Sequence, residues 1–259
     1  MNKIKKTKAV LLDLDGTVYL EDTLIGEVEN TLNLLREKSI KIVYLSNNSS
    51  KTSAQYLEKL KRLNVYREGD IFYSSLDATI DYFKDNYANS KVFAIANQKV
   101  CEELVKKGIT LDKNAEIVLL CYDNELTYEK LCVANKLIVQ GATYIATHPD
   151  KTCPAKEVFV PDVGSFIELL KTSSGKEPQV IIGKPNKIMA NYLIKMLGLK
   201  NDEITMVGDR LYTDIAFGVN NHFNTALVLS GETSFEQAKK SSVKPDIILS
   251  DINEIIKYL

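Results

Sequence analysis

The 259-residue sequence lacks the features that mark secreted, membrane-spanning or metal-thiolate proteins. Its four cysteines include no Cys-x-x-Cys pair, and only two histidines are present, so neither a disulfide framework nor a zinc site is indicated. We interpret the cysteines as small buried side chains. No apolar run approaches the roughly 20 residues that span a membrane, and Asp13 interrupts the apolar run after the basic start too early for a signal peptide. We therefore expect a cytoplasmic protein.

Neither sign of charge is in excess. The chain has 33 Lys and Arg against 34 Asp and Glu, a formal net charge of −1, and no run of five like charges. This balance gives no electrostatic attraction for nucleic acid or for an anionic membrane surface. The 45% hydrophobic and 26% charged residues are ordinary for a globular protein. We expect a small-molecule partner, with no nucleic acid and no membrane.

Short apolar runs rich in β-branched residues alternate with amphipathic stretches along the chain. Such runs are typical of strands that are buried on both faces of a parallel sheet, and the alternation with helices predicts an α/β fold. The predicted strands are 8–14, 41–46, 91–96, 117–122, 143–147, 179–182, 203–207, 224–228 and 246–249. The predicted helices are 28–38, 53–63, 100–107, 128–140 and 187–197.

Nine strands are more than one small sheet needs, which favours two domains. No Gly/Ser-rich linker or internal repeat marks a boundary, but polar segments near residues 74–77 and 172–178 are candidate seams. They predict a core formed by residues 1–76 and 179–259 and an inserted domain over residues 77–178. All four cysteines fall within this insert.

The first chemical signal is Asp13-Leu-Asp15-Gly-Thr, at the end of a predicted strand. Alternation along a strand would place both carboxylates on the same side, where burial is costly unless a cation or a proton compensates. A polar turn is the alternative, because Asp-Gly is a common turn pair. The second signal is Gly208-Asp209 with Asp214 five residues further on, again after an apolar run. Together these carboxylates predict a hard-cation site, for which Mg²⁺ is the typical occupant.

Two further predicted strand ends carry groups suited to an anion. Ser46, Asn47 and Asn48 follow one strand and precede a helix, where they could act as an N-cap or bind an anion. Lys184 stands in Gly-Lys-Pro after the run 179–182. Ligands of parallel α/β sheets bind beyond the carboxyl ends of the strands. One crevice that gathers carboxylates, a lysine and hydroxyls suits phosphoryl transfer.

These four motifs, taken in order, resemble those of the haloacid dehalogenase-like phosphatases, and the long gap before the lysine resembles the NagD-like or para-nitrophenylphosphatase branch. The resemblance implies a Rossmann-like three-layer core with a parallel sheet, an inserted smaller α/β cap, and hydrolysis of small-metabolite phosphomonoesters. It also implies a homodimer as one option. The cap sequence around His148 and Asp150 resembles the branch's Asn-Pro-Asp loop, with histidine in place of the frequent asparagine.

The resemblance also implies roles for individual residues. Asp13 would be the nucleophile that forms an aspartyl-phosphate, and Asp15 the acid and base. Mg²⁺ would be held by Asp13, by Asp209 and by the backbone carbonyl of Asp15, with Asp214 acting through water. The transferring phosphoryl group would be bound by Ser46, Asn47, Asn48 and Lys184.

Three alternatives remain open at this point. A phosphosugar mutase of the same superfamily would share the nucleophile but return the phosphate to its substrate. A non-enzymatic, phospho-accepting receiver-like module would leave Asp15 and the insert unexplained. His148 is either a surface or hydrogen-bonded residue or, with Asp150, part of a specificity loop. A nucleophilic role for the nearby Cys153 has no visible orienting partner.

Overall fold

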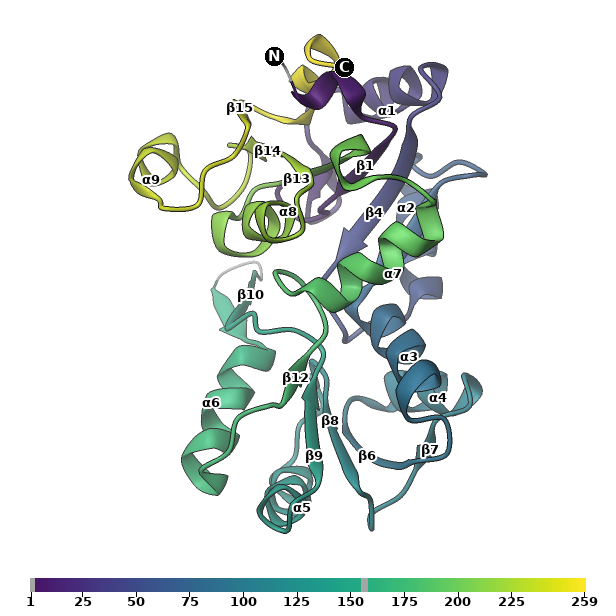
Figure 1. Ribbon diagram of the computed structural model, residues 1–259, viewed down its shortest axis with the longest axis vertical. Coiled ribbons are helices and arrows are strands. Elements are labelled where there is room, and N and C mark those ends of the chain that lie inside the picture. Colours follow the sequence, from purple (N-terminus) through teal and green to yellow (C-terminus); the bar gives the residue numbers. More distant parts are fainter. Residues whose placement is uncertain (1–2, 155–157) are drawn as a thin grey trace. The chain divides into compact units, whose positions relative to one another are not determined.

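The computed structural model describes residues 3–154 and 158–259 (Figure 1). The chain divides into two compact units, and each unit has its own parallel sheet with helices, so the predicted α/β class is confirmed. The first unit comprises Met1–Ser46, Ala54–Tyr73 and Lys184–Leu259, and the second comprises Asn47–Ser53 and Ser74–Gly183.

The first unit is built on a six-stranded sheet with the order β15-β14-β13-β1-β4-β5. From β1 the chain adds β4 and β5 on one side and later β13, β14 and β15 on the other. β1 therefore lies where the strand order reverses, the place at which ligands bind in open parallel sheets. The strands are β1 (Ala9–Leu12), β4 (Lys41–Ser46), β5 (Ile71–Ser74), β13 (Ile204–Gly208), β14 (Asn224–Val228) and β15 (Ile247–Leu249).

Helical elements cover both faces of this sheet, as the alternating side chains of β14 show. Ala226 and Val228 pack in the same apolar cluster as the first two helices, whereas Leu227 packs with the segments that follow β13 and β14. The predicted three layers are thus present. The helical elements are η1 (Lys3–Lys6), α1 (Val28–Glu37), α2 (Ser53–Arg62), α7 (Lys187–Leu197), η2 (Asn201–Glu203), the π-helical turn η3 (Leu211–Ile215), α8 (Ala216–Asn220), α9 (Phe235–Lys240) and η4 (Ile252–Lys257). A short hairpin joins β2 (Tyr19–Leu20) to β3 (Thr23–Leu24).

The second unit has a five-stranded sheet with the order β12-β9-β8-β6-β7 and a separate antiparallel hairpin. Side chains of β6, β8 and β9 form an apolar cluster with α5 and α6. The strands are β6 (Lys91–Ile95), β7 (Thr110–Leu111), β8 (Ile117–Leu120), β9 (Thr143–Ala146), β10 (Thr152–Pro154), β11 (Phe159–Pro161) and β12 (Val180–Ile181). The helices are α3 (Ser75–Asn86), α4 (Gln98–Lys106), α5 (Tyr128–Val139) and α6 (Val163–Ser174).

The junctions between the units differ from the predicted seams. Ser74 is not part of a linker, because its side chain and that of Asp77 form a capping box that starts α3. The run 179–182 was expected in the core, but β12 pairs in parallel with β9 of the second sheet, with Val180 opposite Ile145. Residues 47–53 also belong to the second unit. An apolar run shows that a strand forms, but not which sheet it joins.

Candidate active site

Two neighbouring strands of the first sheet deliver the acidic residues. β1 and β13 pair in parallel with Leu12 opposite Val207, so Asp13 and Asp209 both follow directly at the carboxyl edge. The Asp13 N–H donates to the Val207 carbonyl at 3.0 Å, which continues the ladder by one residue. The position of both carboxylates thus follows from the register of two buried strands.

Asp214 completes an acidic cluster. It lies in the π-helical turn η3, and one carboxylate oxygen each from Asp13, Asp209 and Asp214 can be chosen so that all three lie within 4.8 Å of one another. Asp209 and Asp214 are buried and Asp13 is partly buried. Three carboxylates at such distances repel one another strongly in a site that excludes most water.

Lys184 supplies the opposing charge. Its Nζ donates to Asp13 Oδ1 and to Asp214 Oδ1, both at 2.7 Å, and its side chain is only 1% exposed. Burial lowers the pKa of Lys184, but the two carboxylates more than offset this, and the net shift is upward. The lysine is therefore charged, although it follows β12 of the other sheet instead of ending a strand of the first sheet, as was predicted.

The carboxylates retain an excess of negative charge. Burial and the neighbouring Asp214 raise the pKa of Asp13 well above its ordinary value, against the opposing pull of Lys184. Burial and Asp214 likewise raise the pKa of Asp209 to about 7, although the Glu232 N–H lowers it. Raised values of this kind mean that the cluster favours an added positive charge, whether a proton or a cation.

The donor set fits a hard divalent cation. All three side chains offer oxygen, the ligand type that Mg²⁺ prefers. Asp209 Oδ2 accepts a hydrogen bond from the Glu232 N–H at 2.6 Å, whereas Asp209 Oδ1 is buried with no hydrogen-bond partner within residues 3–154 and 158–259. A buried carboxylate oxygen without a donor is costly, and coordination to a cation would remove that cost.

Asp214 and Asp15 differ in their relation to the cluster. Both oxygens of Asp214 already accept hydrogen bonds, Oδ1 from Lys184 and Oδ2 from the Arg210 N–H at 3.1 Å, an arrangement compatible with the predicted indirect role. Asp15 is exposed in the turn after β1, and it is not in the three-residue acidic group found in the described chain. Coordination through its backbone carbonyl stays a prediction.

The predicted phosphate-binding residues are divided between the two units. Ser46 is the buried last residue of β4, next to β1 in the first sheet. Asn47 and Asn48 belong to the second unit, where Asn47 Nδ2 donates to Asp150 Oδ2 at 3.1 Å and Asn48 Oδ1 accepts from the N–H and hydroxyl of Ser50. Their joint action on a phosphoryl group stays a prediction.

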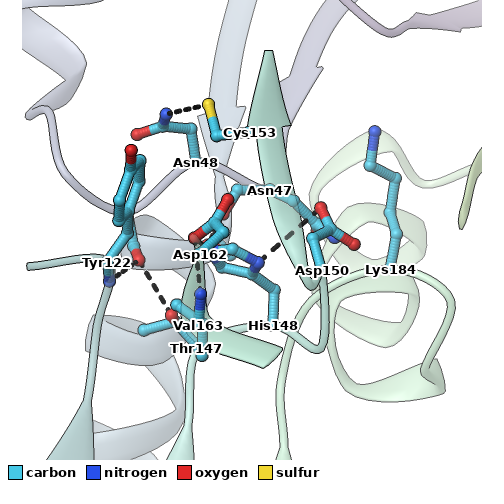
Figure 2. Close-up of polar contacts among 12 residues, drawn as sticks. Asn47, Asn48, Tyr122, Thr147, His148, Asp150, Cys153, Asp162, Val163 and Lys184 are labelled. Atoms are coloured by element: carbon cyan, nitrogen blue, oxygen red, sulfur yellow. Dashed lines mark hydrogen bonds and ion pairs between the residues drawn. The ribbon is translucent and has the colours of Figure 1, made fainter. Parts of the chain in front are cut away.

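The loop around His148 is a buried part of the second unit (Figure 2). The His148 side chain has no exposed surface, and it lies between two acidic side chains: Nδ1 is 3.6 Å from Asp150 Oδ2, and Nε2 is 3.6 Å from Asp162 Oδ1. Asp162 also caps α6 through a 2.7 Å hydrogen bond from the Val163 N–H. His148 thus faces carboxylates, and the Cys153 thiol instead lies 4.0 Å from Asn48 Nδ2.

One contributor to the site escaped the sequence analysis. The segment after β14 places the Glu232 N–H on Asp209, and a Cβ added at Gly231 would overlap the same carboxylate. A positional signal was available, because Ser230-Gly231-Glu232 begins two residues after a predicted strand of the same sheet, close to the end of the strand as in the four recognised motifs. A backbone donor, however, carries no residue-type signature.

Comparisons with known proteins identify the family of the chain. A family model described as haloacid dehalogenase-like hydrolase matches residues 10–110, and one described as HAD-hydrolase-like matches residues 181–255. An acid sugar phosphatase of Staphylococcus aureus (strain MRSA252) is 33% identical over 258 residues, which cover 99% of each chain. The crystal structure of a 4-nitrophenylphosphatase from Thermotoga maritima is 34% identical, with a TM-score of 0.95 and 99% of each chain covered. NagD from E. coli K-12 is 25% identical, with a TM-score of 0.87 and coverage of 96% of this chain and 98% of that one.

A parallel α/β sheet with an acidic cluster and a lysine paired to it at the carboxyl edge is typical of α/β proteins that handle phosphoryl groups. The chain belongs to the haloacid dehalogenase-like hydrolases, in the NagD-like branch, and is a phosphatase. Across the described residues, none of the helices is both long enough and apolar enough to span a membrane.

Proposed function

We propose that this phosphatase hydrolyses phosphomonoesters of small metabolites, phosphorylated sugars in particular, with Mg²⁺ at the Asp13–Asp209–Asp214 cluster. The observation that carries the proposal is Lys184, whose buried ammonium bridges two of the three carboxylates at 2.7 Å each. This arrangement offers both cation ligands and a fixed positive charge for a phosphoryl group. The sugar preference is supported by the relative whose name is acid sugar phosphatase.

In the proposed reaction, an Asp13 carboxylate oxygen attacks phosphorus while the bond from phosphorus to the ester oxygen breaks. Asp15 donates its proton to the departing alkoxide, which leaves as the alcohol. Water then attacks the aspartyl-phosphate, Asp15 takes a proton from that water, and inorganic phosphate leaves with Asp13 restored. Lys184 and the Ser46 hydroxyl bind the phosphoryl oxygens in both steps.

Asp13, Asp209 and the Asp15 carbonyl would hold the cation, with Asp214 supporting it indirectly and keeping Lys184 in place. Mg²⁺, when bound, supplies charge neutralisation for the phosphoryl oxygens. Asp15 stands apart from the acidic cluster and is exposed, which suits a group that must meet both a leaving alcohol and a water molecule.

We assign substrate specificity to the second unit, which contains the residues 77–178 expected to form the inserted cap. Asp150 and the asparagines Asn47 and Asn48 belong to this unit, so polar groups are available there for a sugar. We also retain the expectations of a cytoplasmic location and of no nucleic-acid partner, given the net charge of −1. A homodimer remains one option, which a sedimentation measurement would test.

The test is release of inorganic phosphate by the purified protein. Substrates would be p-nitrophenyl phosphate, sugar phosphates, nucleotides, pyridoxal phosphate and triose phosphates, each with Mg²⁺ or with a chelator. We expect Mg²⁺-dependent release from sugar phosphates and its loss in Asp13→Asn. Isomerised sugar phosphate without free phosphate would indicate the mutase alternative. Undiminished turnover by folded Asp13→Asn would contradict the mechanism.

A further inference from the structure

The segment between β14 and α9, residues 229–234, lies beside the acidic cluster although it belongs to none of the four motifs. β14 pairs in parallel with β13, with Leu227 opposite Gly208, so the chain leaves the sheet next to Asp209. Residues 230–232 of this segment touch the loops that follow both β1 and β13. A fifth strand end thus contributes to the site.

This segment and the turn after β1 together enclose the Asp209 carboxylate. The Glu232 N–H donates to Asp209 Oδ2 at 2.6 Å. A Cβ at Gly16 would lie 2.5 Å from the same oxygen, and a Cβ at Gly231 would overlap it, so glycine at both positions lets the backbone close around the carboxylate. With Oδ2 held in this way, Oδ1 is the oxygen that remains for a cation.

Side chains in turn fix the segment itself. Ser230 Oγ donates to the Gly16 carbonyl at 2.7 Å. The Glu232 carboxylate accepts from Arg210 Nε at 2.9 Å through Oε2 and from the Tyr212 hydroxyl at 2.9 Å through Oε1. Arg210 and Tyr212 follow Asp209 in sequence. Glu232 therefore contacts one short segment twice, through its N–H at Asp209 and through its carboxylate at Arg210 and Tyr212.

We propose that Glu232 is a positioning residue for cation binding, acting through Asp209 and held by Arg210 and Tyr212. This inference rests on the proposed function, because it requires a cation at the acidic cluster. The Glu232 carboxylate does not touch the cluster. Its ion pair and hydrogen bond fix the backbone N–H that orients Asp209. In metal sites, residues that do not bind the metal themselves commonly orient the residues that do.

Loss of the contacts of the Glu232 side chain with Arg210 and Tyr212, which we call the Glu232 clamp, should weaken cation binding without removing a ligand. In Glu232→Ala the N–H remains and Ser230 still binds the Gly16 carbonyl, but the contacts of the Glu232 side chain with Arg210 and Tyr212 are lost, so Asp209 is held less firmly. Removal of such outer contacts typically costs 10–100-fold in metal affinity. Glu232→Gln keeps a hydrogen bond to Tyr212 and loses the charge opposite Arg210, so a smaller loss is expected.

The experiment titrates Mg²⁺ into the purified, substrate-free protein by calorimetry and measures turnover against Mg²⁺ concentration in parallel. We expect Mg²⁺ binding about 10–100-fold weaker in Glu232→Ala and intermediate binding in Glu232→Gln. Because no ligand is removed, kcat at saturating Mg²⁺ should stay close to the wild-type value. Glu236→Gln is the matched control, because the Glu236 side chain is 69% exposed and forms a surface ion pair with Lys239 at 3.1 Å. Its Mg²⁺ affinity should equal that of wild type.

Two outcomes would overturn the inference, and they are distinguishable. If Asp209→Asn abolishes Mg²⁺ binding while Glu232→Ala leaves it unchanged, the positioning role of Glu232 is contradicted and the proposed function stands. If the wild-type protein binds no Mg²⁺, both fail. If Glu232→Ala does not fold, as judged by circular dichroism, Tyr212→Phe replaces it. This variant removes the hydrogen bond from Tyr212 to Glu232 at a half-exposed position. An unchanged Mg²⁺ affinity in Tyr212→Phe would likewise contradict the positioning role of Glu232.

Discussion

Lys184 holds a buried charge between two carboxylates, and we expect its replacement to destabilise the protein. Lys184→Met leaves Asp13 and Asp214 without a compensating cation, and removal of one partner of a buried ion pair costs about 3–5 kcal/mol in the free energy of unfolding. Mg²⁺ should restore part of this loss, because it returns positive charge to the cluster. Urea unfolding of metal-free and Mg²⁺-loaded protein measures both effects.

Lys113→Met is the control for this measurement. Lys113 pairs with Glu129 at 3.0 Å, but both side chains are more than 70% exposed, and such surface pairs contribute about 0–1 kcal/mol. Mg²⁺ should not alter the change in the free energy of unfolding that Lys113→Met causes. Equal losses at Lys113 and Lys184 would show that the ion pairs of the acidic cluster do not stabilise the fold.

Asp15 is expected to affect the leaving group more than the phosphoryl group. In Asp15→Asn no proton is available for the departing alkoxide, so hydrolysis of alkyl phosphates should fall by about 10²–10⁴-fold. p-Nitrophenolate leaves without protonation, and formation of the aspartyl-phosphate from that ester should be slowed much less. Burst kinetics with the two ester classes separate these steps. Equal losses of the burst rate, which reports the first step, for both classes would contradict the acid role of Asp15.

Gly208, the last residue of β13, packs directly against the side chain of Asp214. A Cβ at Gly208 would overlap the Asp214 side chain. Gly208→Ala should therefore displace Asp214 from Lys184 and from the Arg210 N–H, lower the free energy of unfolding by about 1–3 kcal/mol, and weaken Mg²⁺ binding. Calorimetric titration with Mg²⁺ and urea unfolding report these two changes.

Gly218→Ala provides a matched substitution in the same unit. Its Cβ would overlap the Thr225 methyl group and meets no residue of the acidic cluster, so a similar loss of stability is expected with Mg²⁺ binding retained. If both alanine variants bind Mg²⁺ equally well, Asp214 has no part in the cation site.

The sequence was sufficient to predict elements whose signal is local. The buried strands after which Asp13 and Asp209 stand are continuous apolar runs, and β4 and β14 have the predicted bounds. α3 was not predicted, because its polar start at Ser74 was interpreted as a seam although Ser and Asp at this spacing form a capping box. The three-residue strands of the β10–β11 hairpin are too short to show alternation.

At the scale of the whole molecule, the sequence did not predict which unit a segment joins where contacts between residues far apart in the sequence decide it. The motif Ser46-Asn47-Asn48 reads as continuous, yet the chain passes from one unit to the other after Ser46. Asn47 is bound to Asp150, and the Ser49 and Thr147 hydroxyls lie 2.8 Å apart, contacts across roughly 100 residues of sequence. No local pattern contains this information, because partners and register are set only when the sheet forms.

The division of the chain into two units predicts a division of substrate binding. The acidic cluster and Lys184 belong to the first unit, and the buried loop of His148 and Asp150 to the second. If the second unit selects the leaving group, His148→Ala should change kcat/KM among sugar phosphates by about 10–200-fold, the range for altered pocket contacts. The cause would be indirect, because removal of the imidazole leaves Asp150 and Asp162 facing a cavity and lets the loop shift.

Inorganic phosphate provides the contrasting measurement. It carries no leaving group, so its inhibition constant should be nearly the same in His148→Ala and in the wild-type protein, whereas Lys184→Met should weaken it strongly. Measuring the inhibition constant and a substrate panel on the same preparations compares the two units directly. If His148→Ala abolishes phosphate inhibition and preserves the order of substrates, the second unit binds the phosphoryl group, and the assignment of specificity to it is wrong.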